Sequence, residues 1–583
     1  MRSAPTTTSR PRVRVLLTRT LATVALTAAA AAALAGCGSS TPVLSTSADP
    51  ASAIPASAAL YAGATVRPNA PQSTEALAAA HALTHQSDPY LRLLGALQTP
   101  GSPALNYKTD VAPWLGPRAG VFLTSLSAAG PLTATLEQGL LGSSSTSSSF
   151  PLANSAAQGA IVLDTSNVSK AQAFLNTQAQ HAGAHASSYK GVSYQVTAAG
   201  VAFGIVDRFA VIGSEAGLHS VIETTKGGPS LTQSSGYSKL LAAAPSGALA
   251  HIYSNPAGAQ ASAQTSTSQE GLSGLLALLS SGRQANVSVV ASANSLALDA
   301  DTLSGSSSAG LLSTDPQSAQ ALAELPGESW LAIGLGHVGE NLPADVQSLR
   351  ALASLTSIGG ATGVEAPASS SLSIKSLLEG ILAPLNALGA PTAQARHAFT
   401  SWMGPAGIFA SGASLLELKA AVVIESKNPA LSRAAVNELG DQLRKAGGTL
   451  QPVTIAGTEA AIGARLTGLP VVLDIAAGRD SAGHTKFVLG FGEASVTAAL
   501  DPTSTLASAS SRSSAASSIG EGAQPSIVLD LPTLLTLLEG VGLTEDPAIS
   551  KFVPYLRSIS TLAGGGHQLS GEVQRFRLVL GLQ

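Results

Sequence analysis

The fold is decided by a block of sequence that occurs twice, as Trp114–Phe122 (WLGPRAGVF) and as Trp402–Phe409 (WMGPAGIF). The chain has only three tryptophans in 583 residues, so two of them beside the same Gly-Pro pair are hard to obtain by chance. A second block follows each copy, at Ile161–Asn167 and at Val422–Asn428, where an apolar run ends in an acidic residue shortly before Asn. Ordered recurrence of this kind predicts a tandem duplication.

The recurrence continues in both directions from these blocks. Phe209–Glu215 returns around Phe487–Glu493, and the Ile-Pro pair at Ile54 parallels the Leu-Pro pair at Leu325. At about 100 to 200 residues per domain, the chain is long enough for each copy to bury its own core. We therefore expect two similar halves, 54–303 and 324–583, joined by a linker over 304–323.

Each half alternates short β-branched runs with segments of helical spacing. Ala160–Asp164 is typical of a strand, and Asn167–Gln180 has its apolar residues on one helix face. Asn428 followed by Pro429 is a good helix start, because Asn accepts the free N–H groups and Pro is tolerated at the first helical position. Paired strand-like runs close the second half at Gln568–Val573 and Phe576–Leu582. The pattern predicts an α+β fold with largely antiparallel sheets flanked by helices.

The N-terminus has the pattern of a bacterial lipoprotein signal. Arginines from Arg2 to Arg19 precede the uncharged segment Thr20–Gly36, which ends in Leu-Ala-Gly before the single cysteine, Cys37. An Ala-rich segment of this length fits a signal peptide better than a permanent membrane span. We predict a signal peptide over 1–36, then lipidated Cys37 and a flexible tether over 37–53. The mature protein is then expected on the extracytoplasmic face of the cell membrane, held by its lipid anchor.

Composition and charge narrow the range of partners. After removal of residues 1–36 the chain has 26 basic against 34 acidic residues, a formal net charge of −8, with no basic cluster. Nucleic acid is not an expected partner, because phosphate binding needs concentrated Lys and Arg. A single cysteine also excludes a disulfide framework.

Three of these features together resemble the actinobacterial "domain of unknown function 3352" family: the export signal, the Pro-led apolar first strand, and the block formed by Trp114, Gly116 and Arg118. The resemblance covers most of the mature chain. The second copy departs from it, since Ala406 stands where the first copy has Arg118. The resemblance implies an exported envelope protein and supplies no catalytic residue, cofactor or ligand.

The segment Gly334–Gly339 spells GxGxxG after the strand-like run Trp330–Ile333. A dinucleotide site starts its helix inside the motif and carries an acidic residue at the end of the next strand. Here the helix is expected after the third glycine, at Pro343, and no strand-like run precedes Glu365. A Gly-rich strand exit is the better interpretation.

Two histidine pairs and one SxxK motif are also candidates for chemistry. His81 and His85, like His181 and His185, are spaced i, i+4 and could hold zinc from one helix face. Neither pair has a Glu between its members or a clear third ligand, so solvated helix histidines are expected. Ser187–Lys190 matches SxxK in a predicted loop, where abundant Ser makes a chance match easy.

Carboxylates occur at matching positions of the two halves: Asp164 with Glu425, and Glu215 with Glu493. If brought together they could do acid–base work. Each lies just before or within the first turn of a predicted helix, where the helix dipole favours negative charge, so a structural role is expected.

Tryptophans and apolar helices are expected mainly in the core. Trp114 and Trp402 are predicted core anchors, with an exposed aromatic at a groove as the alternative. The helical segments Leu272–Leu279, Leu377–Leu388 and Leu531–Leu543 carry almost no charge and should pack inside, unless they line an apolar groove.

The sequence favours a non-enzymatic, membrane-anchored cell-envelope lipoprotein that binds an envelope protein or wall component. The alternatives are a carrier of an apolar ligand between the two halves and an envelope hydrolase. The hydrolase has no supporting sequence motif. No catalytic, cofactor-binding or metal-binding residue is predicted, and Cys37 is the one predicted site residue. An apolar cavity between the halves would favour the carrier. Converging carboxylates or histidines would favour the enzyme, and a flat surface patch would favour the binding protein.

Overall fold

The computed structural model describes residues 48–67, 70–84, 105–125, 158–255, 284–303, 314–340, 342, 400–414, 416–445, 447–466, 471–540, 542–545, 550 and 553–583. Cys37 and the predicted signal peptide lie outside the described residues, as do the apolar segments 272–279 and 377–388.

All described strands belong to one 20-stranded sheet. In the first half they are β1 (Leu60–Thr65), β2 (Leu115–Leu123), β3 (Gly159–Thr165), β4 (His185–Tyr189), β5 (Val192–Val196), β6 (Val201–Val206), β7 (Phe209–Ser214), β8 (Ala250–Ser254), β9 (Ala285–Ser292) and β10 (Ser295–Leu303). In the second half they are β11 (Ser329–Leu335), β12 (Met403–Ser411), β13 (Lys419–Ser426), β14 (Thr449–Pro452), β15 (Thr458–Arg465), β16 (Leu473–Arg479), β17 (Thr485–Phe491), β18 (Gln524–Asp530), β19 (Ile559–Ser570) and β20 (Val573–Leu582).

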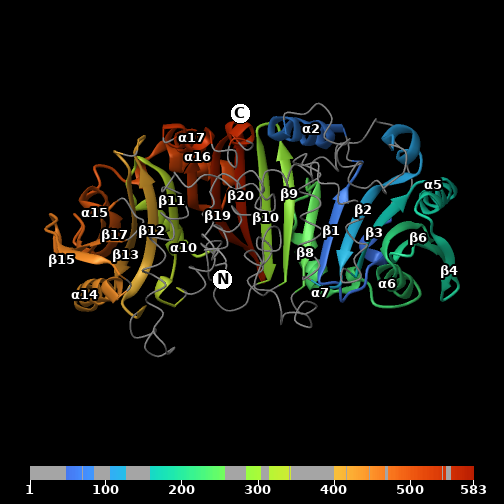
Figure 1. Cartoon of the computed structure of the whole chain (residues 1–583), viewed down its shortest axis with the longest axis horizontal. Helices are drawn as coiled ribbons and strands as arrows, with labels where there is room; N and C mark the ends of the chain where they lie inside the picture. The colour runs from blue at the N-terminus through green and yellow to red at the C-terminus, as the bar shows by residue number, and fades with distance from the viewer. Residues whose placement is uncertain are drawn as a thin grey trace, which may run out of the picture.

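Every pairing in this sheet is antiparallel. From one edge to the other the order is β4-β5-β6-β7-β3-β2-β1-β8-β9-β10-β20-β19-β18-β11-β12-β13-β17-β16-β15-β14. The strands β11 to β20 therefore pair with one another in the same order as β1 to β10. Figure 1 shows β10 and β20 in the middle of the molecule and β4 and β15 toward opposite ends. The prediction of a mixed α+β fold with antiparallel pairing is confirmed.

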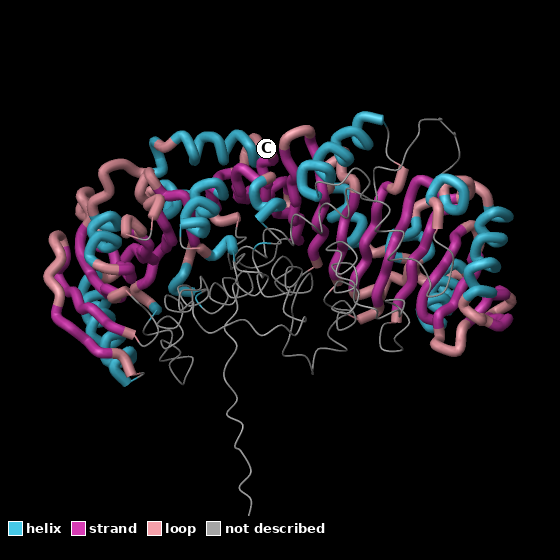
Figure 2. The backbone as a smooth tube through the Cα atoms, turned by 45° about the horizontal axis from the view of Figure 1, so that its top comes forward, coloured by secondary structure: helices cyan, strands magenta, loops and turns pink. Residues whose placement is uncertain are grey.

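Helices cover both faces of the sheet. The described helices are α2 (Ala70–Thr84), α5 (Val168–His181), α6 (Glu215–Thr225), α7 (Ser235–Ala243), α10 (Pro316–Ala323), α14 (Pro429–Lys445), α15 (Glu493–Leu500), α16 (Ser510–Ile519), α17 (Leu531–Gly540) and α19 (Val553–Arg557). One face, here called face A, packs against α6, α7, α10, α15 and α16. The opposite face, face B, packs against α2, α5, α14, α17 and α19. Figure 2 shows the strands following an arched path with helices on both sides.

The helices that follow β3 and β13 begin at the predicted asparagines. Asn167 precedes α5, and its side chain accepts the backbone N–H of Lys170. Asn428 precedes α14, and its side chain accepts the N–H groups of Ala430 and Leu431. The two helices are therefore equivalent, since each follows the corresponding strand of its half. Each begins at its asparagine because the side chain satisfies free N–H groups of the first turn.

Three predicted boundaries need correction. The predicted linker over 304–323 contains α10, whose Ser318, Ala319 and Leu322 are buried, so the second half begins before residue 324. The tether was expected to run to residue 53, but Pro50–Ala53 form a short 3-10 helix with three buried residues, capped by Asp49. The Asp49 carboxylate also pairs with Arg118 at 3.0 Å, which holds this entry segment against the sheet. The expected strand Gln568–Val573 is wrong as well, because the β19–β20 turn falls at Gly571, whose φ is 50°. A left-handed residue suits glycine and reverses the chain there.

The two halves meet along β10 and β20, which pair through nine residues of each strand. On face A this contact carries two ion pairs: Asp301 with Arg575 at 2.7 Å, which is buried, and Asp299 with Arg577 at 2.6 Å, in which only the aspartate is fully buried. Each arginine also donates to the end of a helix: Arg575 to the carbonyl of Ala243 in α7, and Arg577 to that of Ile519 in α16. Among the described residues, charged side chains lie on face A of this junction, and apolar side chains such as Leu296 and Leu580 pack on face B.

Candidate functional site

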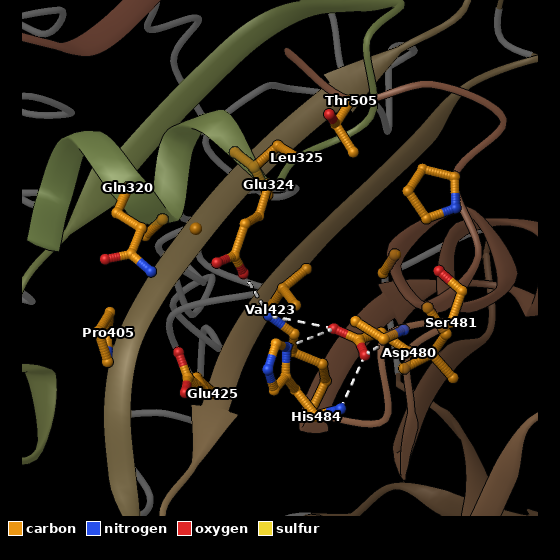
Figure 3. Close-up of a pocket in the computed structure, with 17 residues that line it drawn as sticks. Gln320, Glu324, Leu325, Pro405, Val423, Glu425, Asp480, Ser481, His484 and Thr505 are labelled. Atoms are coloured by element: carbon orange, nitrogen blue, oxygen red, sulfur yellow. Dashed lines mark hydrogen bonds and ion pairs between the residues drawn. The ribbon is translucent and has the colours of Figure 1, made fainter. Parts of the chain in front are cut away.

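A pocket of about 220 Å³ opens on face A of the second half. Its walls come from the end of α10, from β12 and β13, from the β16–β17 turn, and from the segment that follows α15. Figure 3 shows the carboxylates of Glu324, Glu425 and Asp480 on three sides of it. The pocket thus gathers charged groups from segments that are far apart in the sequence.

Lys486 on β17 is the buried centre of this pocket, with 6% of its surface exposed. Its ammonium group binds Glu324 at 2.5 Å and lies 3.6 Å from Asp480. A buried charge needs such partners, because desolvation otherwise costs several kcal/mol. Asp480 is also tied to its own turn, where it accepts the backbone N–H groups of Ala482 and His484. The carboxylates of Glu324 and Asp480 are therefore already bound to other groups of the protein.

Glu425 differs from the other two carboxylates. It lies opposite Lys486 in the β13–β17 register, so both side chains face the pocket, but its carboxylate makes no hydrogen bond or ion pair with any described residue. Its side chain is half-buried. With one lysine and three carboxylates, the pocket has an excess of negative charge, and Glu425 is the group left to meet a ligand.

The corresponding carboxylate of the first half has a different environment. Asp164, near the end of β3, is fully buried, and its carboxylate lies 2.8 Å from the Arg208 guanidinium. Burial raises the pKa of Asp164, and Arg208 opposes that shift. A Cβ at Gly116 would lie 2.4 Å from the Asp164 carboxylate, so only glycine leaves room for it. Asp164 has the predicted structural role, whereas Glu425 lines a pocket, which the sequence did not predict.

Glu215 and Glu493 are the first residues of α6 and α15, as their predicted place in a first helical turn requires. Glu215 also joins a polar network that fastens the β4–β5 hairpin to α6. Its carboxylate accepts the Tyr194 hydroxyl at 2.6 Å, and that hydroxyl accepts from Ser187 at 3.1 Å. Lys190 does not reach Ser187, because it pairs with Glu223 at 2.8 Å. The SxxK residues therefore lie on a hairpin rather than in a loop, and they do not act as a pair.

The histidine pairs do not form metal sites in the described part of the chain. His181 is the last residue of α5, whereas His185 is the first of β4, so the expected shared helix face is wrong for them. His81 is exposed on α2, and His85 lies outside the described residues. Across the described residues, no group of three or more His, Cys, Asp or Glu side chains is arranged to hold a metal ion.

The GxGxxG glycines let β11 approach its neighbours closely. A Cβ at Gly334 would lie 1.8 Å from the Ser318 carbonyl in α10, and one at Gly336 would lie 2.2 Å from the Asp315 carboxylate. That carboxylate caps α10 and binds His337. The helix expected at Pro343 begins at Val338, inside the motif, so that expectation is wrong. The glycines at 334 and 336 are nevertheless positions of close packing against α10 and its cap. Glu365 lies outside the described residues.

Both tryptophans lie in the core with 2% of their surface exposed. Trp114 packs on Phe174 and Trp402 on Phe487, each with ring centroids 5.1 Å apart. Among the predicted apolar helices, the segment 531–543 forms α17 as far as Gly540, and its leucines are buried against face B.

Sequence reasoning did not single out Lys486, Glu324 or Asp480. Lys486 is one lysine in the otherwise apolar run Lys486–Phe491, and a charge in a buried strand is a signal that something pairs with it. Its partners come from α10 and from a turn, so no local pattern could name them.

Fold and pocket define a class: an α+β protein built on one long antiparallel sheet, with a charged pocket in its second half. The chain belongs to the family described as protein of unknown function (DUF3352), whose model matches residues 18–580. The family resemblance noted from the sequence is thereby confirmed. No curated protein and no solved structure matches the chain. None of the described helices is long and apolar enough to cross a membrane.

Proposed function

We propose that this protein is a non-enzymatic, membrane-anchored cell-envelope lipoprotein that binds an envelope protein or wall component in the pocket around Lys486. The observation that carries the proposal is Glu425, a half-buried carboxylate without a partner among the described residues, in a pocket with excess negative charge. Such a group is available to a ligand, whereas Glu324 and Asp480 already hold Lys486. A ligand with a hydrogen-bond donor or cationic group complements it.

An envelope hydrolase is the second candidate, because carboxylates do converge in this pocket. Acid–base catalysis usually needs two groups free to exchange protons with the substrate. Glu425 has no free carboxylate beside it, since Asp480 accepts two backbone N–H groups and Glu324 binds Lys486. This arrangement favours binding over hydrolysis. The carrier of an apolar ligand between the halves finds less support, because ion pairs lie on face A of the described junction and packed side chains such as Leu296 and Leu580 lie on face B.

We also propose that the two halves arose by tandem duplication, which the repeated sequence blocks and the equal order of strand pairing support. The divergence of Asp164 and Glu425 fits this origin, since one copy kept a buried structural carboxylate and the other presents it to a pocket.

Native mass spectrometry tests the pocket. The delipidated protein, purified from its own host, is expected to retain a bound molecule that is lost in the Glu425→Gln variant. Glu417→Gln is the matched control, because it makes the same charge change on an exposed turn outside the pocket. A bound molecule retained equally by both variants would contradict binding at Glu425. Turnover of that molecule by the wild type and not by Glu425→Gln would favour the hydrolase.

Acyl labelling tests the anchor separately. Cys37→Ser is expected to abolish incorporation of a fatty-acid label and to block signal removal after Gly36. Persistent labelling of this variant would contradict the lipoprotein assignment and leave the pocket experiment unaffected.

A further inference from the structure

The 20-stranded sheet has two open ends, and they differ. β4 is the last strand at one end and pairs only with β5 among the described strands. In Figure 1 it lies at the outer limit of the first half. β14 is the last strand at the other end and pairs only with β15. An open strand edge presents unpaired backbone groups to any second strand, so proteins usually block such edges.

The β14 edge is blocked by its own sequence. It has four residues and ends in Pro452, which lacks a backbone N–H. β4 is longer, with five residues (HASSY), and contains neither Pro nor Lys. Its open edge therefore lacks the usual protection.

The hairpin geometry identifies the backbone groups that β4 leaves free. Lys190 and Gly191 form the two-residue β4–β5 turn, and both have positive φ, as in a type I′ turn. In such a hairpin the flanking pair, Tyr189 with Val192, exchanges hydrogen bonds, and the pattern then alternates along the strand. Ser187 and His185 thus bond toward β5. The N–H and C=O groups of Ala186 and Ser188 point outward, and both residues are exposed.

We propose that β4 pairs antiparallel with β4 of a second copy of the chain, about a twofold axis at Ser187. In this register Ala186 of one copy lies opposite Ser188 of the other, and the two pairs exchange four hydrogen bonds. Ser187 lies opposite its own counterpart in a non-hydrogen-bonded pair. His185 lies opposite Tyr189, so no like charges meet along the strand. The contact is self-complementary and closes after two copies.

A second copy fits this edge better than a head-to-tail chain of copies. Head-to-tail growth would need β4 to pair with β14 of the next molecule, and the short strand with Pro452 disfavours that contact. A twofold contact uses the unprotected strand of both molecules, buries both open edges at once, and leaves the pocket around Lys486 at the far end of each sheet.

Cysteine cross-linking tests the register, because the chain has no cysteine other than Cys37. In the mature chain carrying Cys37→Ser, the Ser187→Cys variant places two thiols across the axis with Cα atoms about 4.5 Å apart, within disulfide reach. Ser188→Cys is the matched control, because its two copies are diagonal neighbours about 8 Å apart, too far to bridge. Mild oxidation at high protein concentration is expected to give a covalent dimer at least about tenfold faster with Ser187→Cys.

A noncovalent measurement accompanies it. Sedimentation of the Cys37→Ser chain is expected to show a concentration-dependent dimer, and Ala186→Pro, which removes an outward N–H group, is expected to be monomeric. The proposal is overturned if Ser187→Cys and Ser188→Cys cross-link at equal rates, or if neither does and the chain stays monomeric. Cross-linking of Ser187→Cys to a different protein in host membranes would also overturn it, in favour of a partner strand.

Discussion

Asp299 and Arg577 are each the fifth residue of the closing strand in their half, and they face one another in the β10–β20 register. The same position thus carries opposite charges in the two halves, and the resulting ion pair lies at the centre of the sheet. Asp299 is fully buried, and Arg577 reaches it through two hydrogen bonds of 2.6 and 2.7 Å. If two first halves were joined at this position, two aspartates would face one another. If two second halves were joined there, two arginines would face one another. The charge pattern therefore favours pairing of one half with the other.

Removal of Arg577 is expected to destabilise the whole sheet. Arg577→Ala leaves Asp299 buried without its partner, which typically costs about 3–5 kcal/mol of unfolding free energy. Arg577→Asp should cost more, and the exchange Asp299→Arg with Arg577→Asp should recover part of the loss. Urea unfolding measures these values. Arg557→Ala, which breaks an exposed ion pair with Glu539, is the control and should cost less than about 1 kcal/mol. Equal effects of both single variants would argue against a central role for the pair.

His251 makes the first half sensitive to acid. It lies partly buried beside Tyr61 and Tyr237, and its Nε2 lies 3.2 Å from the Tyr237 hydroxyl. Burial lowers the pKa of His251 to about 4. The unfolded chain takes up this proton near pH 6.5, so stability is complete above that pH and is lost as the pH falls toward 4, by about 3 kcal/mol.

The test is the unfolding free energy of wild type and His251→Phe between pH 4 and 7. The difference between the two proteins should change with pH in that direction, and His181→Phe, at an exposed site, should leave the wild-type profile unchanged. A His251→Phe variant with the full wild-type slope would show that other groups cause the acid sensitivity.

Asp474 in the second half affects stability with the opposite pH dependence. It is buried on β16, and its carboxylate makes no hydrogen bond with any described residue. Burial, followed by repulsion from Glu493, raises its pKa to about 6. The folded state then prefers the protonated form, so this group supports folding below pH 4 and costs stability as the pH rises to 6 and above.

Asp474→Asn is therefore expected to raise the unfolding free energy at pH 7 by about 1–3 kcal/mol, with a smaller gain at pH 4.5. Thermal unfolding at both pH values measures the effect. Asp441→Asn, on the exposed part of α14, makes the same chemical change as a control and should give a difference near zero. Destabilisation of Asp474→Asn at pH 7 would mean that the charged carboxylate has a function in the folded protein.

Gly116 makes room for the buried Asp164. The Cβ of an alanine at this position would lie 2.4 Å from the carboxylate and 2.9 Å from the backbone of Asp164, so the strand pair must move. Gly116→Ala is expected to cost at least about 2 kcal/mol in denaturant unfolding. Gly247→Ala, where no atom lies within 4 Å, is the matched control and should change stability little. If the two variants behave alike, the close approach of Gly116 to Asp164 is not what limits this position.

Local signals predicted much of the fold correctly. The asparagines at 167 and 428 begin their helices because capping involves only the next few residues. The burial of Trp114 and Trp402 follows from hydrophobicity, which is also local. The turn at Gly571 was misplaced because the expected strand Gln568–Val573 was drawn through Ser570-Gly571, although Ser-Gly is a dipeptide typical of turns.

By itself, the sequence determined the class of fold, the starts of the repeated helices and the burial of Trp114 and Trp402, because periodicity, capping and hydrophobicity act over a few residues. The tertiary structure alone decided that both halves share one sheet, that Asp299 meets Arg577, and that Lys486 gathers Glu324 and Asp480 beside an unpaired Glu425. These contacts join residues up to 278 positions apart, and their energy depends on burial and distance, which chain order does not encode.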